Sequence, residues 1–584
     1  MKILLCNIAL RSETCFFPPV ACTSLCNVLL KAGYSTQFYN IDSERPSTKK
    51  LSEFFKVGQF DVIGISAVAS TGYRYTKYLA DLIKRVSPKV QVILGGNLAA
   101  SYEVILRKCQ IDICVIGEGE KVLLNLVKHW EKHGNFKPPN RELYGIKGIS
   151  FLNSDGVCIF TGEEKLIDNG EISQPDYKLL DKFSDINQYI LDPMIEYAFA
   201  NDPRSYKAHR QGKKLTTLFT SKGCVNKCTF CHRWIKGYRV IPPKKVIATM
   251  RHLMDRYNAS FFYISVECFA ENKQWLEAFI KAVKPLDVLF VVGGARVSLL
   301  RKDTTVIQRL KNVGLTAINF GIESGSNKML KIIEKNATPD ENLAALKICA
   351  EAGVHTTIQL VIGMPGENSQ TINETIEFIK RATGNLPYPP SISINYLQSL
   401  PGTPCYEFLR YHGFLGKTIE DEERYLFRVS DTNASDFKQY VNVSEEPLSK
   451  VKLWQRQLDL LPTIHWLKQH GWKFPTNQEK GYCSNKTIEH TVVSRIKLFL
   501  RSKATIYRIV DFMGQYFWRI LLFKNRCSLY GGRKTFLITF GLIIEENRSS
   551  FKIGNKSLRE ILPLKKSAMF LPSEGIAGRT MNNV

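Results

Sequence analysis

Brief apolar runs alternate with longer amphipathic stretches through residues 1–135 of the chain. Brief runs between turn signals are typical of buried strands, and here they occupy residues 3–6, 36–39, 62–65, 90–94 and 113–116. The stretches between them have helical spacing, at residues 20–31, 73–86, 103–108 and 121–131. Strands that alternate with helices predict a parallel α/β sheet, which holds ligands beyond the carboxyl ends of its strands.

A second alternation of the same kind occupies residues 213–410. Six strands are expected there, at residues 215–220, 261–265, 288–292, 317–321, 356–362 and 392–396. Helical stretches follow all but the last strand, at residues 245–256, 273–282, 305–313, 341–352 and 370–381. This order predicts a partial (β/α)6 barrel with functional residues at its C-terminal strand ends. Residues 136–212 are less regular and contain several prolines, so we expect a connecting region.

Beyond residue 410 the pattern changes, and residues 411–584 predict a helical, basic accessory region. Residues 448–469 have helical spacing, whereas residues 495–499 and 507–523 mix Arg and Lys with aromatic side chains. The whole chain carries a net charge of +26, and residues 481–584 alone hold 18 basic and 6 acidic residues. Such a surface is typical of a solvated or substrate-binding face, and contact with anionic lipid or nucleic acid is the alternative.

Composition bounds the class of protein. With 584 residues, 44% hydrophobic and 23% charged, the chain is globular and too long for one core. The longest apolar run, residues 536–544, falls short of the ~20 residues that cross a bilayer, so no transmembrane segment is expected. Residues 1–10 begin like a signal peptide, but the apolar run is brief and is followed by Arg11 and Glu13, which favours a first strand. Fifteen cysteines are too sparse for a disulfide scaffold, which favours a reducing, cytoplasmic location.

Residues 223–231 read GCVNKCTFC and contain the sharpest chemical feature of the chain. Cys224, Cys228 and Cys231 follow a predicted strand with C-x3-C-x2-C spacing, so their thiolates can converge on one iron–sulfur cluster. Three ligands for a four-iron cluster leave one iron open to another molecule. A structural zinc site is the alternative, and it would need a fourth ligand such as the adjacent His232.

Glycine and small polar residues follow three strands of the first sheet: Gly64, Ser66, Gly95, Gly96, Gly117, Glu118 and Gly119. Glycine permits tight turns and lets a bulky ligand approach the backbone. These positions therefore predict a ligand site at the carboxyl edge of the sheet. Ordinary glycines of strand-to-helix turns are the alternative interpretation.

The cysteine segment, with Phe230 before the third cysteine, resembles the signature of radical SAM enzymes. Residues 321–326 (GIESGS), 362–367 (IGMPGE) and 400–404 (LPGTP) resemble later barrel segments of that family, in the expected order. The resemblance implies that the three cysteines bind a 4Fe-4S cluster whose open iron binds S-adenosylmethionine. Electron transfer from the cluster then yields methionine and a 5′-deoxyadenosyl radical, which abstracts hydrogen from the substrate.

The same resemblance implies residues that contact S-adenosylmethionine: Phe230, Glu267, Arg296, Glu323, Ser324 and Gly363. Phe230 would lie near the adenine, and Glu267 would contact the methionine amino group. Residues 266–268 read VEC, however, and lack the glycines of the family's GGE element. Arg296 would pair with the methionine carboxylate. Glu323 would bind the ribose or methionine, or else pair with a neighbouring arginine at the barrel lip.

Residues 94–96 and 115–120 resemble motifs of the Rossmann-like (flavodoxin-type) cobalamin-binding domain that precedes many radical SAM barrels. This resemblance assigns Gly64, Ser66 and the other strand-end residues above to cobalamin. The D-x-H-x-x-G sequence, whose histidine binds cobalt in methionine-synthase-like proteins, is absent. Cobalamin would therefore bind base-off without a histidine ligand from the protein.

Together these resemblances imply cobalamin-dependent methylation of an unactivated carbon in a natural product or lipid, with a flavodoxin- or ferredoxin-type electron donor. Radical cyclisation or rearrangement is the first alternative. Methylthiolation of tRNA is disfavoured, because neither a three-cysteine N-terminal domain nor a C-terminal RNA-binding barrel is evident. A zinc-bound nucleic-acid module would explain the basic tail but not the barrel motifs, so nucleic acid is not an expected partner.

Two pairs of histidines lie at helical spacing: His129 with His133, and His465 with His470. No third ligand is near either pair in the sequence. We therefore expect surface residues rather than a metal site.

Overall fold

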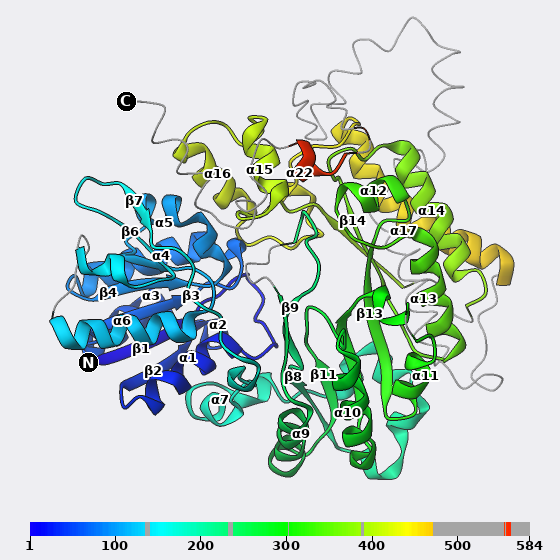
Figure 1. The fold of residues 1–584 in the computed structure, drawn as a ribbon, viewed down its shortest axis with the longest axis horizontal. Helices are drawn as coiled ribbons and strands as arrows, with labels where there is room; N and C mark the ends of the chain where they lie inside the picture. Colours follow the sequence, from blue (N-terminus) through cyan, green and yellow to red (C-terminus); the bar gives the residue numbers. More distant parts are fainter. Residues whose placement is uncertain are drawn as a thin grey trace, which may run out of the picture.

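The computed structural model describes residues 1–134, 141–231, 237–301, 303–386, 391–470, 554 and 556–561. Two α/β halves lie side by side, and helices from the later part of the chain extend across one end of both (Figure 1). The two stretches with alternating apolar runs thus fold into separate sheets, as their patterns predict.

Seven strands form the N-terminal sheet in the order β2-β1-β3-β4-β5-β6-β7. Five are parallel and match the five predicted runs: β1 (Lys2–Asn7), β2 (Ser35–Asn40), β3 (Val62–Ser66), β4 (Gln91–Gly95) and β5 (Ile113–Val115). Strands covered on both faces need apolar residues throughout, which is why these segments appear as runs rather than alternations.

Helices cover both faces of this sheet. On one face lie α1 (Val20–Lys31) and α6 (Gly119–His133). On the other lie α3 (Thr48–Gly58), α4 (Tyr73–Val86) and α5 (Tyr102–Lys108), and the short α2 (Ile41–Glu44) follows β2. The helices α1 and α4 begin and end at the residues that the hydrophobic spacing predicts.

Two antiparallel strands, β6 (Ile149–Leu152) and β7 (Cys158–Phe160), extend the sheet beyond residue 135. They lie in the segment expected to be a connecting region, and each is too short to produce a clear apolar pattern. The helix α7 (Tyr177–Phe183) follows them and also belongs to this segment.

The second half is a six-stranded parallel sheet in the order β15-β14-β13-β12-β11-β8, an open partial barrel as predicted. Its strands are β8 (Lys214–Leu218), β11 (Ala259–Ile264), β12 (Leu289–Ala295), β13 (Leu315–Glu323), β14 (Ile358–Ile362) and β15 (Ile392–Tyr396). Its helices are α9 (Pro243–Tyr257), α10 (Lys273–Val283), α11 (Val306–Lys311), α12 (Asn327–Ile332), α13 (Pro339–Glu351) and α14 (Ser369–Thr383). A separate antiparallel hairpin, β9 (Ser221–Cys224) and β10 (Gly237–Val240), follows β8.

The connecting region also closes the interior of the barrel near the beginnings of its strands. The short helix α8 (Tyr197–Ala200) places Phe199 against Phe261 of β11, with ring centroids 5.0 Å apart. Ala198 and Phe199 share a small buried cluster with residues at the starts of β8, β11, β12 and β13. The C-terminal strand ends therefore remain the accessible side of the barrel.

His355, just before β14, provides a pH test of this packing. Its ring lies 4.8 Å from that of Tyr197, and burial lowers the pKa of His355 from 6.5 to about 4. Below pH 6.5 the His355 side chain binds a proton in the unfolded chain but not in the folded chain. The contribution of neutral His355 to the free energy of unfolding is therefore fully present above pH 6.5 and decreases as the pH falls toward 4. We expect a loss of up to about 3 kcal/mol across this window.

Scanning calorimetry of apo-protein at several pH values measures the effect. The His355→Phe variant, which cannot titrate, should lose less Tm than the wild type between about pH 7 and pH 5. The same substitution at the exposed His252 serves as the control. Equal acid sensitivity of wild type and His355→Phe would contradict this assignment.

A helical strap from the C-terminal part of the chain packs on the N-terminal half. After α15 (Pro404–Tyr411), the helix α16 (Ile419–Val429) lies against α4 and α5. Glu423 of α16 accepts hydrogen bonds from the Tyr73 hydroxyl and the Lys77 ammonium, each at 2.6 Å. Leu426 is fully buried in the core of the N-terminal half. The two halves are thus held together by residues that follow the barrel.

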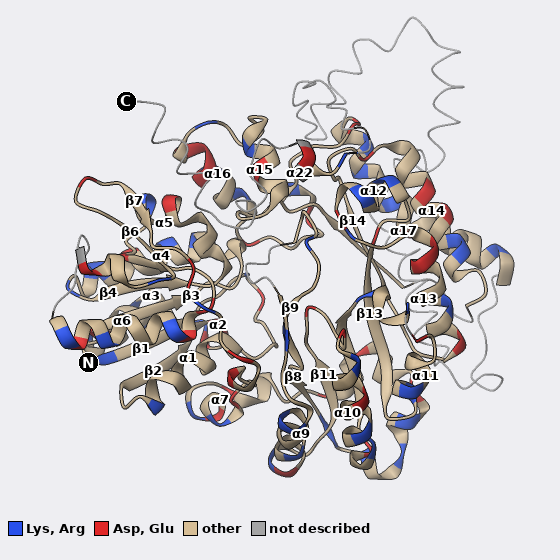
Figure 2. Cartoon of the chain, viewed as in Figure 1, with Lys and Arg blue, Asp and Glu red and all other residues tan. Residues whose placement is uncertain are grey.

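The chain continues into α17 (Leu448–His470), which packs on α14, and the described part ends with α22 (Leu558–Ile561). Both signs of charge are spread over the outer helices (Figure 2). The basic aromatic stretches at 495–499 and 507–523 lie outside the described residues. Among the helices that the structure describes, none is long and apolar enough to cross a membrane.

Candidate active site between the two halves

A cavity of about 480 Å³ lies between the carboxyl edge of the N-terminal sheet and the barrel. All seven strand-end residues expected at a ligand site line it: Gly64, Ser66, Gly95, Gly96, Gly117, Glu118 and Gly119. The barrel side contributes Phe219, Ser221, Lys222, Ser265, Val266 and Glu267. The structure therefore brings the edge of one sheet to the mouth of the other.

Two of these glycines shape the cavity in different ways. Gly96 has a φ of +89° and lies so close to the backbone of Ala67 that a Cβ atom would clash. Gly95 has ordinary backbone angles, and no atom lies within 4 Å of the position a Cβ would occupy. Gly96 thus permits the close turn, whereas the lack of a side chain at Gly95 leaves the backbone open to the cavity.

Glu118 connects the N-terminal sheet to the β9–β10 hairpin. Its carboxylate accepts hydrogen bonds from Arg239 at 2.6 and 3.0 Å and lies 2.8 Å from the Lys222 ammonium. Burial would raise the pKa of Glu118, but the hydrogen bond from Arg239 and the charge of Lys222 outweigh it and lower that pKa. Glu118 was expected as a cobalamin contact, and the structure shows its carboxylate in an ion-pair network at the edge of the cavity.

The cysteine segment begins on this same hairpin. Cys224 is the last residue of β9, and Cys228 and Cys231 lie in the loop that follows. Cys224 and Cys228 are buried, Cys231 is half-buried, and none of the three forms a disulfide. His232, the fourth ligand that a zinc site would need, lies outside the described residues.

Backbone and amide contacts hold the loop against the barrel. The Thr229 amide donates to the Ile333 carbonyl at 3.0 Å, and the Cys231 amide donates to the Cys228 carbonyl at 3.2 Å. The Asn226 amide group donates to the Lys335 carbonyl at 2.6 Å and to the Cys228 sulfur at 3.4 Å. A turn fixed in this way, with three closely spaced cysteines and an amide donor to sulfur, fits the ligand set of an iron–sulfur cluster.

Two buried cations lie beside the cysteine loop. Lys335 donates to Glu323 at 2.7 Å, and burial would lower the Lys335 pKa, but the charges of Glu323 and of Cys228 raise it. The Arg296 guanidinium donates to the Lys335 carbonyl at 3.1 Å. The partner of Glu323 is therefore a lysine, rather than the arginine considered from sequence. Lys335 itself belongs to no motif that would have drawn attention to it.

Glu323 ends β13 in the left-handed region, with a φ of +63°. Non-glycine residues at positive φ are strained and cluster at functional sites. Its carboxylate is nearly buried beside Lys335, so the strained backbone and the ion pair together fix its position at the barrel mouth.

The remaining predicted residues lie away from the cavity lining. The Ser324 hydroxyl is 3.1 Å from that of Thr375 on α14. The Gly363 amide donates to Glu367 at 2.5 Å, and its carbonyl accepts from the Tyr440 hydroxyl at 2.9 Å. Phe230 packs at the margin of the main core. These residues surround the mouth of the barrel without lining the shared cavity.

The loop after β11 approaches both the cavity and the cysteines. Glu267 lines the cavity, and Cys268 is fully buried beside Cys224, which raises the pKa of the Cys268 thiol. In place of glycines at 266–268, the facing strand β12 supplies Gly294, where a Cβ atom would clash with the Val266 carbonyl. Gly294 thus lets β12 approach the loop after β11 closely at Val266.

Comparison with protein families agrees with this arrangement. The model of the B12 binding domain matches residues 11–127, and the model of the radical SAM superfamily matches residues 218–379. The chain contains a B12-binding domain followed by a radical SAM domain. The first match contains the glycine-lined side of the cavity, and the second contains the cysteine loop and the barrel strands β11 to β14.

Relatives of this chain have more than one named activity. The anaerobic magnesium-protoporphyrin IX monomethyl ester cyclase of Cereibacter sphaeroides is 27% identical over 368 residues, which are 62% of this chain and 56% of the relative. A protein named as an uncharacterized methyltransferase, from Pyrococcus horikoshii, is 29% identical over 366 residues, which are 60% of this chain and 69% of the relative. The chain thus spans little more than half the length of the cyclase.

Solved structures share the fold. The radical S-adenosylmethionine methyltransferase TsrM from Kitasatospora setae, solved with cobalamin and a [4Fe-4S] cluster, is 17% identical. It has a TM-score of 0.53, over 71% of this chain and 76% of TsrM. The cobalamin-dependent radical enzyme OxsB is 19% identical with a TM-score of 0.52, over 67% of this chain and 53% of OxsB. At these identities the likeness establishes the two-domain architecture alone.

Proposed function

We propose that this radical SAM protein is a cobalamin-dependent methyltransferase that acts on an unactivated carbon of a natural product or lipid. The observation that carries the proposal is the cavity shared by the glycine-lined edge of the B12-binding domain and the hairpin that bears Cys224. When bound, the cluster with S-adenosylmethionine supplies a hydrogen-abstracting radical, and cobalamin supplies a methyl group.

The chain's own residues have distinct tasks in this proposal. Cys224, Cys228 and Cys231 bind three irons of a 4Fe-4S cluster. The guanidinium of Arg296, which is almost wholly buried, offers positive charge for the methionine carboxylate next to the cysteine loop. Glu267, on the wall of the cavity, accepts hydrogen bonds from the methionine amino group.

The cavity fits a corrinoid held without a protein imidazole. No histidine is among the described residues that line it, in agreement with the absent D-x-H-x-x-G sequence. Its lining is mainly apolar or glycine, so a large flat ring system can lie against the backbone at Gly64, Gly95 and Gly117. Cobalamin bound base-off is the ligand that this lining favours.

Radical cyclisation is the second candidate function. It is favoured by the matches to anaerobic magnesium-protoporphyrin IX monomethyl ester cyclases, at 27% and 25% identity. The cyclase reaction would use the same cysteine loop and the same cavity. It differs in the fate of S-adenosylmethionine, because no methyl group leaves it for transfer.

Product analysis under anaerobic, reducing conditions separates the two candidates. Protein reconstituted with iron, sulfide and hydroxocobalamin is mixed with S-adenosylmethionine and a reductant, without substrate. A methyltransferase should release about one S-adenosylhomocysteine per bound cobalamin, together with slow formation of 5′-deoxyadenosine. Formation of 5′-deoxyadenosine with no S-adenosylhomocysteine would overturn methyl transfer and favour cyclisation.

We infer a reduced flavodoxin- or ferredoxin-type protein as the electron donor and the cytoplasm as the location. The many buried free thiols support a reducing compartment. A small molecule or lipid is the proposed substrate, and the residues after the barrel would shape its binding site.

A further inference from the structure

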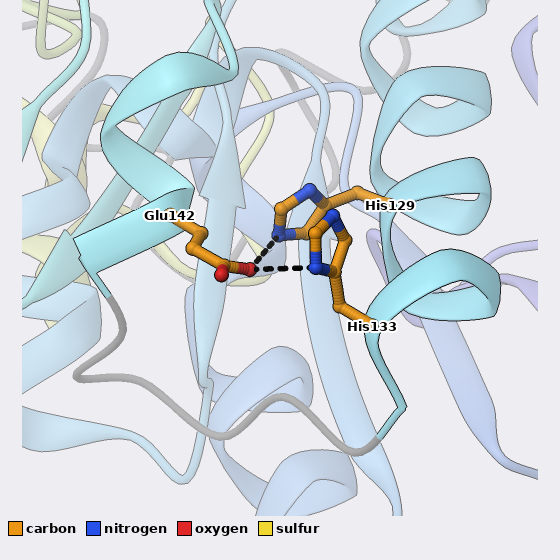
Figure 3. Close-up of side chains that lie close together, drawn as sticks. All are labelled: His129, His133 and Glu142. Carbon is orange, nitrogen blue, oxygen red and sulfur yellow. Dashed lines mark ion pairs between the residues drawn. The ribbon is translucent and has the colours of Figure 1, made fainter.

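Two histidines and a carboxylate meet in the N-terminal half, just beyond the residues that match the B12 binding domain. His129 and His133 lie one turn apart at the C-terminal end of α6, and Glu142 lies on the 3-10 helix η3 (Arg141–Gly145) (Figure 3). One nitrogen of each ring and one carboxylate oxygen lie within 4.8 Å of one another. The fold thus supplies the third ligand that the sequence around the histidine pair did not reveal.

The two distances from the Glu142 carboxylate match those around a small metal ion. The Glu142 carboxylate oxygen is 3.6 Å from His129 Nε2 and 3.2 Å from His133 Nδ1. A tetrahedral zinc ion with bonds of about 2.0–2.1 Å places its ligand atoms about 3.3 Å apart. Both rings are directed at the same oxygen, and their centroids are 4.7 Å apart (Figure 3). An ion between the three groups therefore needs only small side-chain shifts.

We propose that His129, His133 and Glu142 bind one borderline divalent transition-metal ion, with Zn²⁺ as the best match. Two imidazoles at i and i+4 with one carboxylate suit zinc, and a water molecule completes four-fold coordination. Harder ions such as Mg²⁺ and Ca²⁺ are disfavoured, because they select oxygen ligands.

The position of this site indicates a structural role. Glu120, near the start of α6, lines the cavity, whereas His129 lies nine residues farther along the helix. At 1.5 Å per residue this separation is about 14 Å, so the ion is remote from the cavity. By joining α6 to η3, it would fix the C-terminal end of a helix whose N-terminal end forms the cavity wall.

Zinc titration of the full-length protein, with its iron–sulfur cluster reconstituted anaerobically, tests the proposal. The wild type should bind one more Zn²⁺ per chain than the His133→Asn variant. Zinc bound by cysteines contributes equally to the zinc content of both proteins, because both contain every cysteine. His209→Asn is the matched control. His209 lies 3.0 Å from the carboxylate of Asp287, as His133 lies close to Glu142, but that ion pair contains one histidine instead of two.

Two further readouts keep the test independent of folding defects. Glu142→Gln, at a half-exposed side chain, should weaken binding of the added zinc by at least about tenfold. The zinc absorption-edge spectrum of the wild-type minus His133→Asn difference should show nitrogen and oxygen ligands only. Equal zinc content in wild type and His133→Asn, unchanged affinity in Glu142→Gln, or sulfur in the difference spectrum would each overturn the proposal.

Discussion

Replacing Cys228 with serine is expected to abolish both cluster binding and cleavage of S-adenosylmethionine. The Cys228 thiol is buried in a loop that is fixed to the barrel by Thr229 and Asn226, so no other thiol can move into its place without breaking these contacts. A four-iron cluster with only two thiolate ligands from the protein loses its attachment at a second iron. We expect iron content to fall from about four per chain to near zero after anaerobic reconstitution and desalting.

The exposed Cys15 provides the control. Cys15→Ser removes a thiol from the chain but touches neither the loop nor the hairpin, and it should retain the wild-type iron content and 5′-deoxyadenosine formation. Retention of a full cluster by Cys228→Ser would show that these cysteines are not its ligands. Zinc without iron in the wild type would show the same and would revive the zinc-module interpretation.

Replacing Gly95 with phenylalanine is expected to prevent cobalamin binding while the fold is kept. The position has ordinary backbone angles, and a Cβ there meets no atom within 4 Å, so the ring extends into the 480 Å³ cavity rather than into the protein. Because a corrinoid must lie against this wall, the added ring occupies its volume. Binding should weaken by at least about a hundredfold, equivalent to roughly 3 kcal/mol.

Equilibrium dialysis with hydroxocobalamin measures this change, and iron content checks that the barrel is intact. The control is Gly170→Phe, at an exposed glycine outside the cavity where a Cβ also meets nothing within 4 Å. Loss of cobalamin in Gly95→Phe alone, with the iron cluster retained, is the expected result. Unchanged cobalamin affinity in Gly95→Phe would place the cofactor elsewhere or exclude it.

The sheets were predictable because their strands are buried on both faces. Runs such as residues 62–65 and 113–116 are apolar over nearly every position, and the structure places β3 and β5 there. The antiparallel β6 and β7 were missed because strands of four and three residues do not produce a pattern that differs from a loop. The local pattern of apolar residues thus identified the parallel strands but not the two antiparallel strands at the edge of the N-terminal sheet.

Part of the candidate site was predictable for a different reason. Glycines that follow parallel strands share one edge of the sheet, so Gly64, Gly95 and Gly117 could be placed together from sequence alone. The partners of Glu118 could not be predicted from the sequence. Lys222 and Arg239 lie more than a hundred residues away, and their contact with Glu118 depends on how the two halves meet. The proximity of Glu142 to His129 and His133 was not predicted either, because no helical spacing relates Glu142 to the two histidines.

The strap formed by α16 has a consequence for how this protein is made. Tyr73 and Leu426 belong to one buried core, although roughly 350 residues of chain separate them. During synthesis, the surface of α4 and α5 that α16 covers stays open to solvent until the ribosome has passed the entire barrel. A fragment cut after residue 135 would keep that apolar surface exposed and would also lack β6 and β7. The first domain in the sequence is therefore the last to be completed, and it cannot be excised intact at the boundary that its sequence pattern predicts.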